Sequence, residues 1–149
     1  MSDSAFANPH LPDHTQEPWL AVVAGLIFRH GRLLITQRRA GDHLGGLWEF
    51  PGGKLEAGET AAEGLCRELR EELGIEVRVG ARLALVEHRY PERNVRLEFF
   101  RCTLLRGEPQ PLGCQATAWV TAAELAHYEF PAADAQLLAQ LRSSPLLWA

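Results

Sequence analysis

One stretch near the middle of the chain, GGKLEAGETAAEGLCRELREELGI at residues 52–75, constrains the fold more than any other. It opens with two glycines, which can adopt backbone angles that other residues avoid. A helix is predicted to follow, because Thr60 and Glu63 have the spacing of a capping box and Gly74 stands where helices commonly end. Apolar residues recur at helical spacing between these signals, so one face of the helix is predicted to pack in a core. These residues are Ala62, Leu65, Cys66, Leu69 and Leu73.

The segments around this helix are predicted to be strands and two further helices. Apolar, β-branched or alternating stretches predict strands at residues 19–28, 32–37, 77–87, 95–105 and 116–120. Thr121 with Glu124 predicts a brief helix, and a second helix is predicted over residues 132–142. Glycine-rich residues 39–47 and residues 90–94 read as connections. The pattern predicts a mixed α/β domain.

The length and composition of the chain limit the classes of function. Its 149 residues fit one domain, predicted at residues 19–144, with a disordered tail at 1–18 and a C-terminal tail at 145–149. The first tail lacks the basic start and apolar run of a signal peptide, and no stretch approaches membrane-spanning length. A net charge of −4 argues against binding to a nucleic acid polymer. Three cysteines without a CxxC pair favour a cytoplasmic protein, and both a monomer and a homodimer remain open.

Three glutamates lie close together on the predicted helix. Glu68, Glu71 and Glu72 occupy positions i, i+3 and i+4, which places them on one flank beside the apolar stripe. Carboxylates so close repel one another, and a hard cation such as Mg²⁺, which prefers oxygen ligands, would relieve that repulsion. Arg67 could brace one of them through a bidentate pair. A solvated helix face without function is the alternative for this segment.

Residues 53–75 resemble the Nudix box at every specified position. The matched pattern is Gly53, five residues, Glu59, seven residues, Arg67-Glu68-Leu69, one residue, Glu71-Glu72, one residue and Gly74-Ile75. The resemblance implies the Nudix fold, a mixed β-sheet sandwiched between helices, with the box as a loop–helix–loop. It also implies Mg²⁺, with Mn²⁺ as a possible substitute, as the cofactor of a hydrolase that acts on phosphorus-containing anhydrides. The implied metal ligands are Glu68, Glu71, Glu72 and the carbonyl of Gly52, with Arg67 and Glu59 as supports of the catalytic loop and helix.

Outside the box, residues 22–141 are similar to the MutT subgroup of that family. The stretches that carry this similarity are ITQRRAGDHLGGLWEFPGGK, HRYPERNVRLEFF and YEFPAADAQLL. The similarity implies hydrolysis of the small-molecule substrate 8-oxo-dGTP to 8-oxo-dGMP and pyrophosphate, a reaction that sanitises the nucleotide pool. Arg38 and Lys54 match positions that contact the triphosphate, and Phe50 and Tyr90 match positions of the base pocket. A surface role for Arg38 and a core role for Phe50 are the alternatives.

Asp134 departs from the subgroup's pattern. The subgroup's best-known member has asparagine at this position, which reads the oxidised base. An amide both donates and accepts hydrogen bonds, whereas an ionised carboxylate only accepts. Relatives that act on CTP and modified dCTP resemble this chain here, so pyrophosphohydrolysis of those nucleotides is the alternative activity. Asp134 could also be a helix N-terminal residue without contact to the base.

A second departure lies upstream of Trp119. Related enzymes often carry a glutamate there, whereas this chain has Gly113, Cys114 and Gln115. The identity of the general base is therefore open, with Glu98, Glu87 and Glu71 as candidates. The missing glutamate also raises an alternative of another class, a Nudix-fold domain that binds a damaged base without cleaving the nucleotide.

Overall fold

The computed structural model describes residues 19–149, so the predicted tail at residues 1–18 lies outside the described residues. The strands are β1 (Trp19–Arg29), β2 (Arg32–Gln37), β3 (Trp48–Glu49), β4 (Gly52–Lys54), β5 (Glu76–Arg89), β6 (Asn94–Arg106) and β7 (Ala116–Val120). The helices are α1 (Ala61–Leu73) and α2 (Ala135–Arg142), together with the 3-10 segments η2 (Glu124–His127), η3 (Ala132–Asp134) and η4 (Pro145–Trp148).

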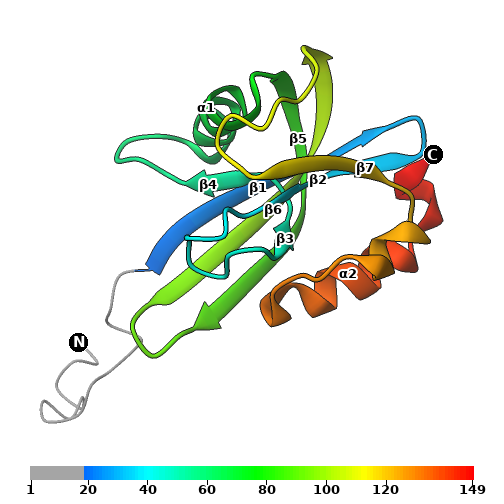
Figure 1. Ribbon diagram of the computed structural model, residues 1–149. Helices are drawn as coiled ribbons and strands as arrows, with labels where there is room; N and C mark the ends of the chain where they lie inside the picture. Colours follow the sequence, from blue (N-terminus) through cyan, green and yellow to red (C-terminus); the bar gives the residue numbers. More distant parts are fainter. Residues whose placement is uncertain (1–18) are drawn as a thin grey trace, which may run out of the picture.

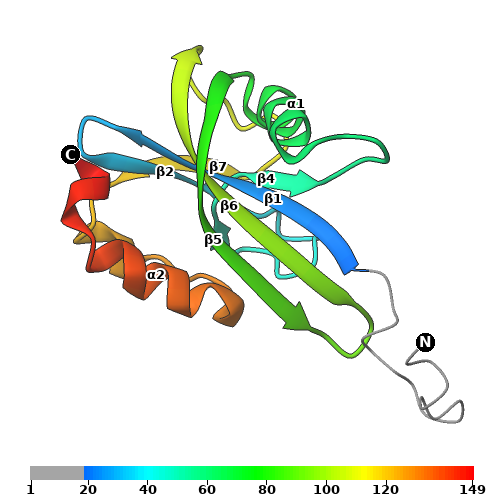
Figure 2. The same ribbon diagram turned by 180° about the vertical axis from the view of Figure 1, so that it is seen from behind.

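Strand β1 is the centre of a mixed sheet (Figures 1 and 2). It pairs in parallel with β6, from Trp19 opposite Asn94 to Ile27 opposite Cys102. Its other neighbours, β4 and β2, are antiparallel to it, and β7 pairs with β2. The main path of the sheet is β3-β2-β1-β6-β5. The predicted mixed sheet is confirmed.

Helices cover both sides of this sheet (Figure 1). Alternate side chains of a strand point to opposite faces. Val23 and Ile27 of β1 therefore pack in a buried cluster with the leucines of the predicted stripe of α1, whereas Ala62 of that stripe is exposed. Ala24 and Leu26 pack in a second cluster with Leu137 and other residues of the α2 side. The sheet thus lies between two helical layers, as the resemblance implied. Within residues 19–149, neither helix is both long and apolar enough to cross a lipid bilayer.

The ends of α1 follow the sequence signals. Thr60 accepts a hydrogen bond from the backbone of Glu63 at 3.1 Å, and the Glu63 side chain accepts one from Thr60 at 2.9 Å. Gly74 ends the helix with a φ of 68°, a left-handed conformation that glycine adopts without strain. The helix predicted over 132–142 begins instead with the 3-10 segment η3, and regular α-helix starts at Ala135.

Strand β4 is a pairing that the sequence analysis did not predict. Gly52 lies opposite Ala24 of β1. A β-carbon at Gly52 would collide with the carbonyl oxygen of Val23, so only glycine allows this close approach. The bend predicted from the two glycines is therefore part of the sheet, and it brings the start of the 52–75 segment against the central strand.

Residues 145–149 were predicted as a tail outside the domain, and the structure differs. Trp148 is buried, and its ring packs edge-on against Phe28 with the ring centroids 5.2 Å apart. The indole Nε1 donates to the carbonyl oxygen of Leu141 at 2.9 Å. The segment belongs to the domain because its large apolar side chain fills the cluster on the α2 side and its polar atom finds a partner there.

Candidate functional site

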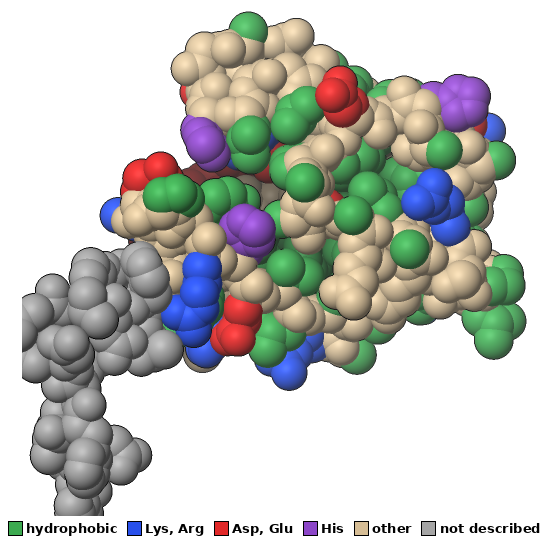
Figure 3. All heavy atoms as spheres, turned by 90° about the horizontal axis from the view of Figure 1, so that it is seen from below, with side chains coloured by type: hydrophobic (Ala, Val, Ile, Leu, Met, Phe, Trp, Pro, Cys, Tyr) green, Lys and Arg blue, Asp and Glu red, His purple; other side chains and the backbone are tan. Residues whose placement is uncertain are grey.

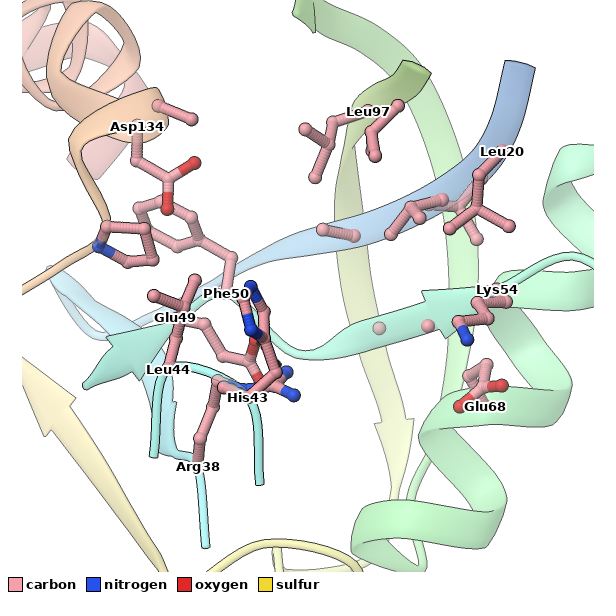
Figure 4. A pocket seen from close by; sticks show the side chains of 18 of the residues that line it. Leu20, Arg38, His43, Leu44, Glu49, Phe50, Lys54, Glu68, Leu97 and Asp134 are labelled. Carbon is pink, nitrogen blue, oxygen red and sulfur yellow. Dashed lines mark hydrogen bonds and ion pairs between the residues drawn. The ribbon is translucent and has the colours of Figure 1, made fainter. Parts of the chain in front are cut away.

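A cleft of about 760 Å³ opens along β1 and β4 (Figure 4). Its wall includes the connection between β2 and β3, helix α1, the connection between β5 and β6, and the segment before α2. Seen from below, the molecular surface in Figure 3 shows Lys and Arg side chains scattered and not gathered into one basic patch. Eight residues selected from the sequence line this cleft: Arg38, Phe50, Gly52, Lys54, Glu68, Glu72, Tyr90 and Asp134.

Two glutamates of α1 form the acidic end of the cleft. The side chain of Glu68 is 14% exposed, and a β-carbon at Gly53 would collide with its carboxylate. The bare glycine backbone therefore lets this carboxylate lie against β4. Burial, followed by the negative charge of Glu68, raises the pKa of Glu72 to about 7. Two carboxylates in one place are stabilised by added positive charge.

Glu71 lies apart from this pair. Its side chain is 61% exposed and accepts a hydrogen bond from Nη1 of Arg67 at 3.1 Å. It does not line the cleft. Across residues 19–149, no three His, Cys, Asp or Glu side chains are grouped as a ready metal site. The oxygen donors that the cleft does offer, Glu68, Glu72 and the backbone of Gly52, are of the kind that suits a hard divalent cation.

Arg67 connects the helix to the loop that precedes it. Its Nε and Nη2 donate to the two carboxylate oxygens of Glu59 at 2.6 and 3.0 Å, and Nη2 also donates to the carbonyl of Lys54 at 3.1 Å. Nη1 donates to Glu68 at 3.1 Å. These hydrogen bonds hold the pKa of the Glu59 carboxyl below its usual value. One guanidinium thus fixes β4, the loop and α1 relative to one another.

Aromatic side chains line the opposite end of the cleft. Phe50 is buried, and its ring lies 5.9 Å from that of Phe99 and 5.1 Å from that of Phe130. It also lines the cleft, so one ring belongs to both the core and the cleft wall. Tyr90 is half-buried in the β5–β6 connection, and burial followed by the charge of Asp134 raises its pKa. Aromatic and other apolar side chains thus form most of this end of the cleft, with Asp134 among them.

Asp134 lies at this aromatic end and faces the cleft (Figure 4). It is 7% exposed, and its side chain makes no capping hydrogen bond to α2. Among the described residues, none donates a hydrogen bond to its carboxylate. Burial, followed by the charge of Glu49, raises the pKa of Asp134 to about 6. Asp134 is thus the N-terminal residue of α2, as the alternative considered from the sequence had it, and it is also a buried acceptor directed into the cleft.

Glu49, which the sequence analysis did not select, also lines the cleft. Its Oε1 accepts a hydrogen bond from Nη1 of Arg38 at 3.1 Å, and burial raises its pKa. The signal available in the sequence was a carboxylate between two large apolar residues, Trp48 and Phe50. Arg38 also donates through Nε to the carbonyl of His43 at 2.6 Å. In Figure 4 these side chains lie on one side of the cleft, with Lys54 and Glu68 on the other.

The candidate bases on the strands lie outside the cleft. Glu87 pairs with Arg96 and Glu98 pairs with Arg82, each at 2.8 Å, and neither glutamate lines the cleft. Gly113 does line it, and a β-carbon there would lie 3.1–3.3 Å from atoms of Glu72. The glutamate that related enzymes often carry is thus missing from a position beside the acidic end.

The chain is similar to known proteins over most of its length. The family model described as NUDIX domain matches residues 23–140. The 8-oxo-dGTP diphosphatase of Proteus vulgaris is 46% identical over 90 residues, which cover 60% of this chain and 80% of that protein. The CTP pyrophosphohydrolase of Escherichia coli is 40% identical over 119 residues, or 80% of this chain and 88% of that protein. The solution structure of the E. coli ORF135 protein superposes with a TM-score of 0.78 at 35% identity, covering 89% of this chain and 95% of that one.

The family match covers nearly all of the sheet, α1 and most of α2. It includes every residue that lines the cleft except Leu20 and Val22. Two of the box glutamates, Glu68 and Glu72, line the acidic end, and Arg67 joins Glu68 to Glu59 in the loop before α1. The chain belongs to the Nudix hydrolase family.

Proposed function

We propose that the protein is a Mg²⁺-dependent nucleoside triphosphate pyrophosphohydrolase of the MutT type that converts 8-oxo-dGTP to 8-oxo-dGMP and pyrophosphate. The observation that carries this proposal is that one cleft joins the acidic end at Glu68 and Glu72 to the aromatic end at Phe50 and Asp134. A nucleotide has the same two parts, a phosphate chain that needs cations and a base that needs a flat apolar surface. The 8-oxo-dGTP diphosphatase of Proteus vulgaris, at 46% identity, supports the same substrate.

Each part of the cleft has a role in this reaction. Glu68, Glu72 and the Gly52 carbonyl would hold Mg²⁺, or Mn²⁺ as a substitute, and the cation would offset the charge of the phosphate oxygens. Lys54 and Arg38 would neutralise phosphate charge that the cation leaves. Phe50 and Tyr90 would pack against the base, and Asp134 would accept a hydrogen bond from a base N–H. Glu71 is left outside the ligand set because its side chain is outside the cleft.

A second candidate is pyrophosphohydrolysis of CTP or a modified dCTP. It is favoured by Asp134, since a carboxylate acceptor suits the 4-amino group of cytosine. The E. coli CTP pyrophosphohydrolase, at 40% identity, supports it as well. If Asp134 reads the base, Asp134→Asn should shift the preference toward 8-oxo-dGTP, and equal relative kcat/KM values across substrates would remove that role.

A binding domain without catalysis is the alternative of another class. It is favoured by the absence of a carboxylate at Gly113, beside Glu72. Such a domain would bind the nucleotide with an affinity that does not depend on Mg²⁺, and it would release no pyrophosphate.

We place the enzyme in the cytoplasm as part of nucleotide-pool sanitation and mutation avoidance, as a monomer or a homodimer. The three cysteines, Cys66, Cys102 and Cys114, are free thiols, which suits a reducing compartment.

The deciding experiment measures pyrophosphate release with Mg²⁺ from 8-oxo-dGTP, dGTP, 5-methyl-dCTP, CTP and ADP-ribose, compared by kcat/KM. We expect the highest value for 8-oxo-dGTP. The highest value for a cytosine nucleotide would replace the proposed substrate with the second candidate. No turnover of any compound, together with binding that is unaffected by EDTA, would favour the binding domain.

A further inference from the structure

We infer that Glu49 is a positioning residue, which holds the guanidinium of Arg38 in the orientation that receives the substrate's phosphate chain. The inference rests on the proposed function, because it assumes that a phosphate chain lies in the cleft. It adds a residue that neither the box nor the MutT-like stretches assigned a role.

Arg38 is held at two of its three nitrogens. Nη1 donates to Glu49 at 3.1 Å, and Nε donates to the carbonyl of His43 at 2.6 Å. Within residues 19–149, Nη2 forms no hydrogen bond. Two fixed partners on one planar group leave little rotational freedom, so the third nitrogen has a defined direction for a ligand in the cleft.

The sheet explains why these two side chains meet. Thr36 and Gln37 of β2 lie opposite Glu49 and Trp48 of β3, and the backbone N–H of Arg38 continues this antiparallel pairing by donating to Leu47 at 2.9 Å. Arg38 and Glu49 are therefore diagonal neighbours across the strand pair, close enough for long side chains to touch.

The place of Glu49 is costly for a carboxylate. Its side chain is only 27% exposed, and burial raises its pKa. Arg38 is the one described residue that forms a hydrogen bond with its carboxylate. A half-buried charge with a single partner stabilises a fold only weakly. The presence of Glu49 is therefore better explained by its effect on the orientation of Arg38.

Glu49 also keeps Arg38 from a competing partner. Arg38 and Glu72 both line the cleft, although no ion pair joins them within residues 19–149. Without Glu49, the guanidinium could turn toward the acidic end of the cleft and pair with Glu72. The phosphate chain would then lose the oriented guanidinium of Arg38. That guanidinium would instead lie at the acidic end of the cleft, where it would compete with Mg²⁺.

A double-mutant cycle tests this role. The probe is 2′-deoxyguanosine 5′-(α,β-imido)triphosphate, which resists cleavage at the bond concerned, and its Kd is measured by calorimetry with Mg²⁺. We expect Glu49→Gln to weaken binding about tenfold, as the loss of a charge-assisted hydrogen bond would. In the Arg38→Ala background the same change should alter the Kd by about twofold or less.

The control variant is Glu108→Gln, which removes a comparable ion pair with Arg29 at 2.7 Å outside the cleft and should leave the Kd unchanged. An equal loss of affinity from Glu49→Gln in both backgrounds would overturn the inference, because Glu49 would then act without Arg38. No loss in either background would overturn it as well. The thermal unfolding temperature of each variant is measured as well. A variant whose unfolding temperature falls well below that of the wild type has a damaged fold, and its change in Kd is then attributed to that damage.

Steady-state kinetics separate this inference from the proposed function. Glu49→Gln should raise KM for dGTP and CTP by the same factor and change kcat less, because the phosphate chain is common to both. A changed ratio between the two bases would assign Glu49 to the base and overturn the inference. Turnover by the wild-type protein without coupling of Glu49 to Arg38 overturns the inference alone. Coupled binding without turnover overturns only the proposed function, and no binding by the wild-type protein overturns both.

Discussion

Arg67 donates to both carboxylate oxygens of Glu59, through Nε at 2.6 Å and through Nη2 at 3.0 Å. Glu59 lies in the loop just before α1 and Arg67 lies within the helix, so this bidentate pair fixes where the helix begins relative to the loop. Lysine could not replace arginine here, because a single ammonium cannot make both bonds and also reach the Lys54 carbonyl.

This pair predicts a dependence of stability on pH. The hydrogen bonds from Arg67 lower the pKa of Glu59 in the folded protein below the usual 4.5. Its contribution to stability is therefore complete above pH 4.5 and is lost as the pH falls through the lowered value. Glu59→Gln should be less stable than the wild type at pH 7, with the difference shrinking in acid. Urea unfolding at pH 7 and at pH 3 measures this, and an equal difference at both would exclude the ionic contribution.

Asp134 predicts the opposite dependence. Burial raises its pKa from 3.8 to about 6, so the folded protein holds this proton more tightly than the unfolded chain. The stability contribution of the group is present below pH 3.8 and is lost as the pH rises to about 6. Asp134→Asn should therefore be more stable than the wild type at pH 7, by on the order of 3 kcal/mol. Equal or lower stability of the variant at pH 7 would show that the buried carboxylate is stabilised by the fold.

The different positions of the box glutamates predict unequal effects on catalysis. Glu72→Gln removes a charge from the acidic end of the cleft and should lower kcat about 10²-fold or more. Glu71→Gln, in a side chain that is 61% exposed and directed toward Arg67, should lower it much less. Pyrophosphate release at saturating Mg²⁺ provides the comparison, with circular dichroism to verify the fold. A larger loss from Glu71→Gln would mean that this side chain moves into the cleft when the cation binds.

The strand glutamates should be dispensable for the reaction. Glu87→Gln and Glu98→Gln each break an ion pair outside the cleft, with Arg96 and Arg82. We expect kcat within about twofold of the wild type for both, because neither side chain lines the cleft. Ion pairs near the surface also contribute little to the stability of a fold, so the variants should stay folded. A pH–rate profile that loses its acidic limb in either variant would identify that residue as the base after all.

The C-terminal aromatic residue should matter for stability and not for chemistry. Trp148→Ala empties part of the cluster on the α2 side and removes the hydrogen bond to Leu141, which should cost about 3–5 kcal/mol. Trp148→Phe keeps most of the volume and should cost less. Chemical denaturation measures both, and wild-type stability of the alanine variant would return residues 145–149 to the status of a tail.

Local signals in the sequence predicted the elements that depend on neighbours in the chain. The capping residues and the apolar stripe predicted where α1 lies in the sequence. The helical repeat then predicted that Glu68 and Glu72 lie one turn apart on the same face. The orientation of Glu71 was not predictable in this way, because it depends on which acceptors Arg67 finds in three dimensions.

Pairings between distant segments were harder to predict. Strand β4 exists because Gly52 meets Ala24, and two glycines in sequence indicate only that the backbone is permissive there. Glu49 was missed for a related reason, since its importance comes from Arg38 on another strand. Trp148 was assigned to a tail because its partner Phe28 lies at the other end of the chain.

The parallel pairing of β1 with β6 has a consequence for how the protein folds. Most of the sequence that builds the cleft, including β4 and α1, lies between these two strands in the chain. Contacts between such distant segments close a long loop, and topologies rich in them fold slowly compared with local hairpins and helices. In a refolding experiment, helical signal from α1 should therefore return before enzymatic turnover, and turnover should return only at the rate at which the two strands meet.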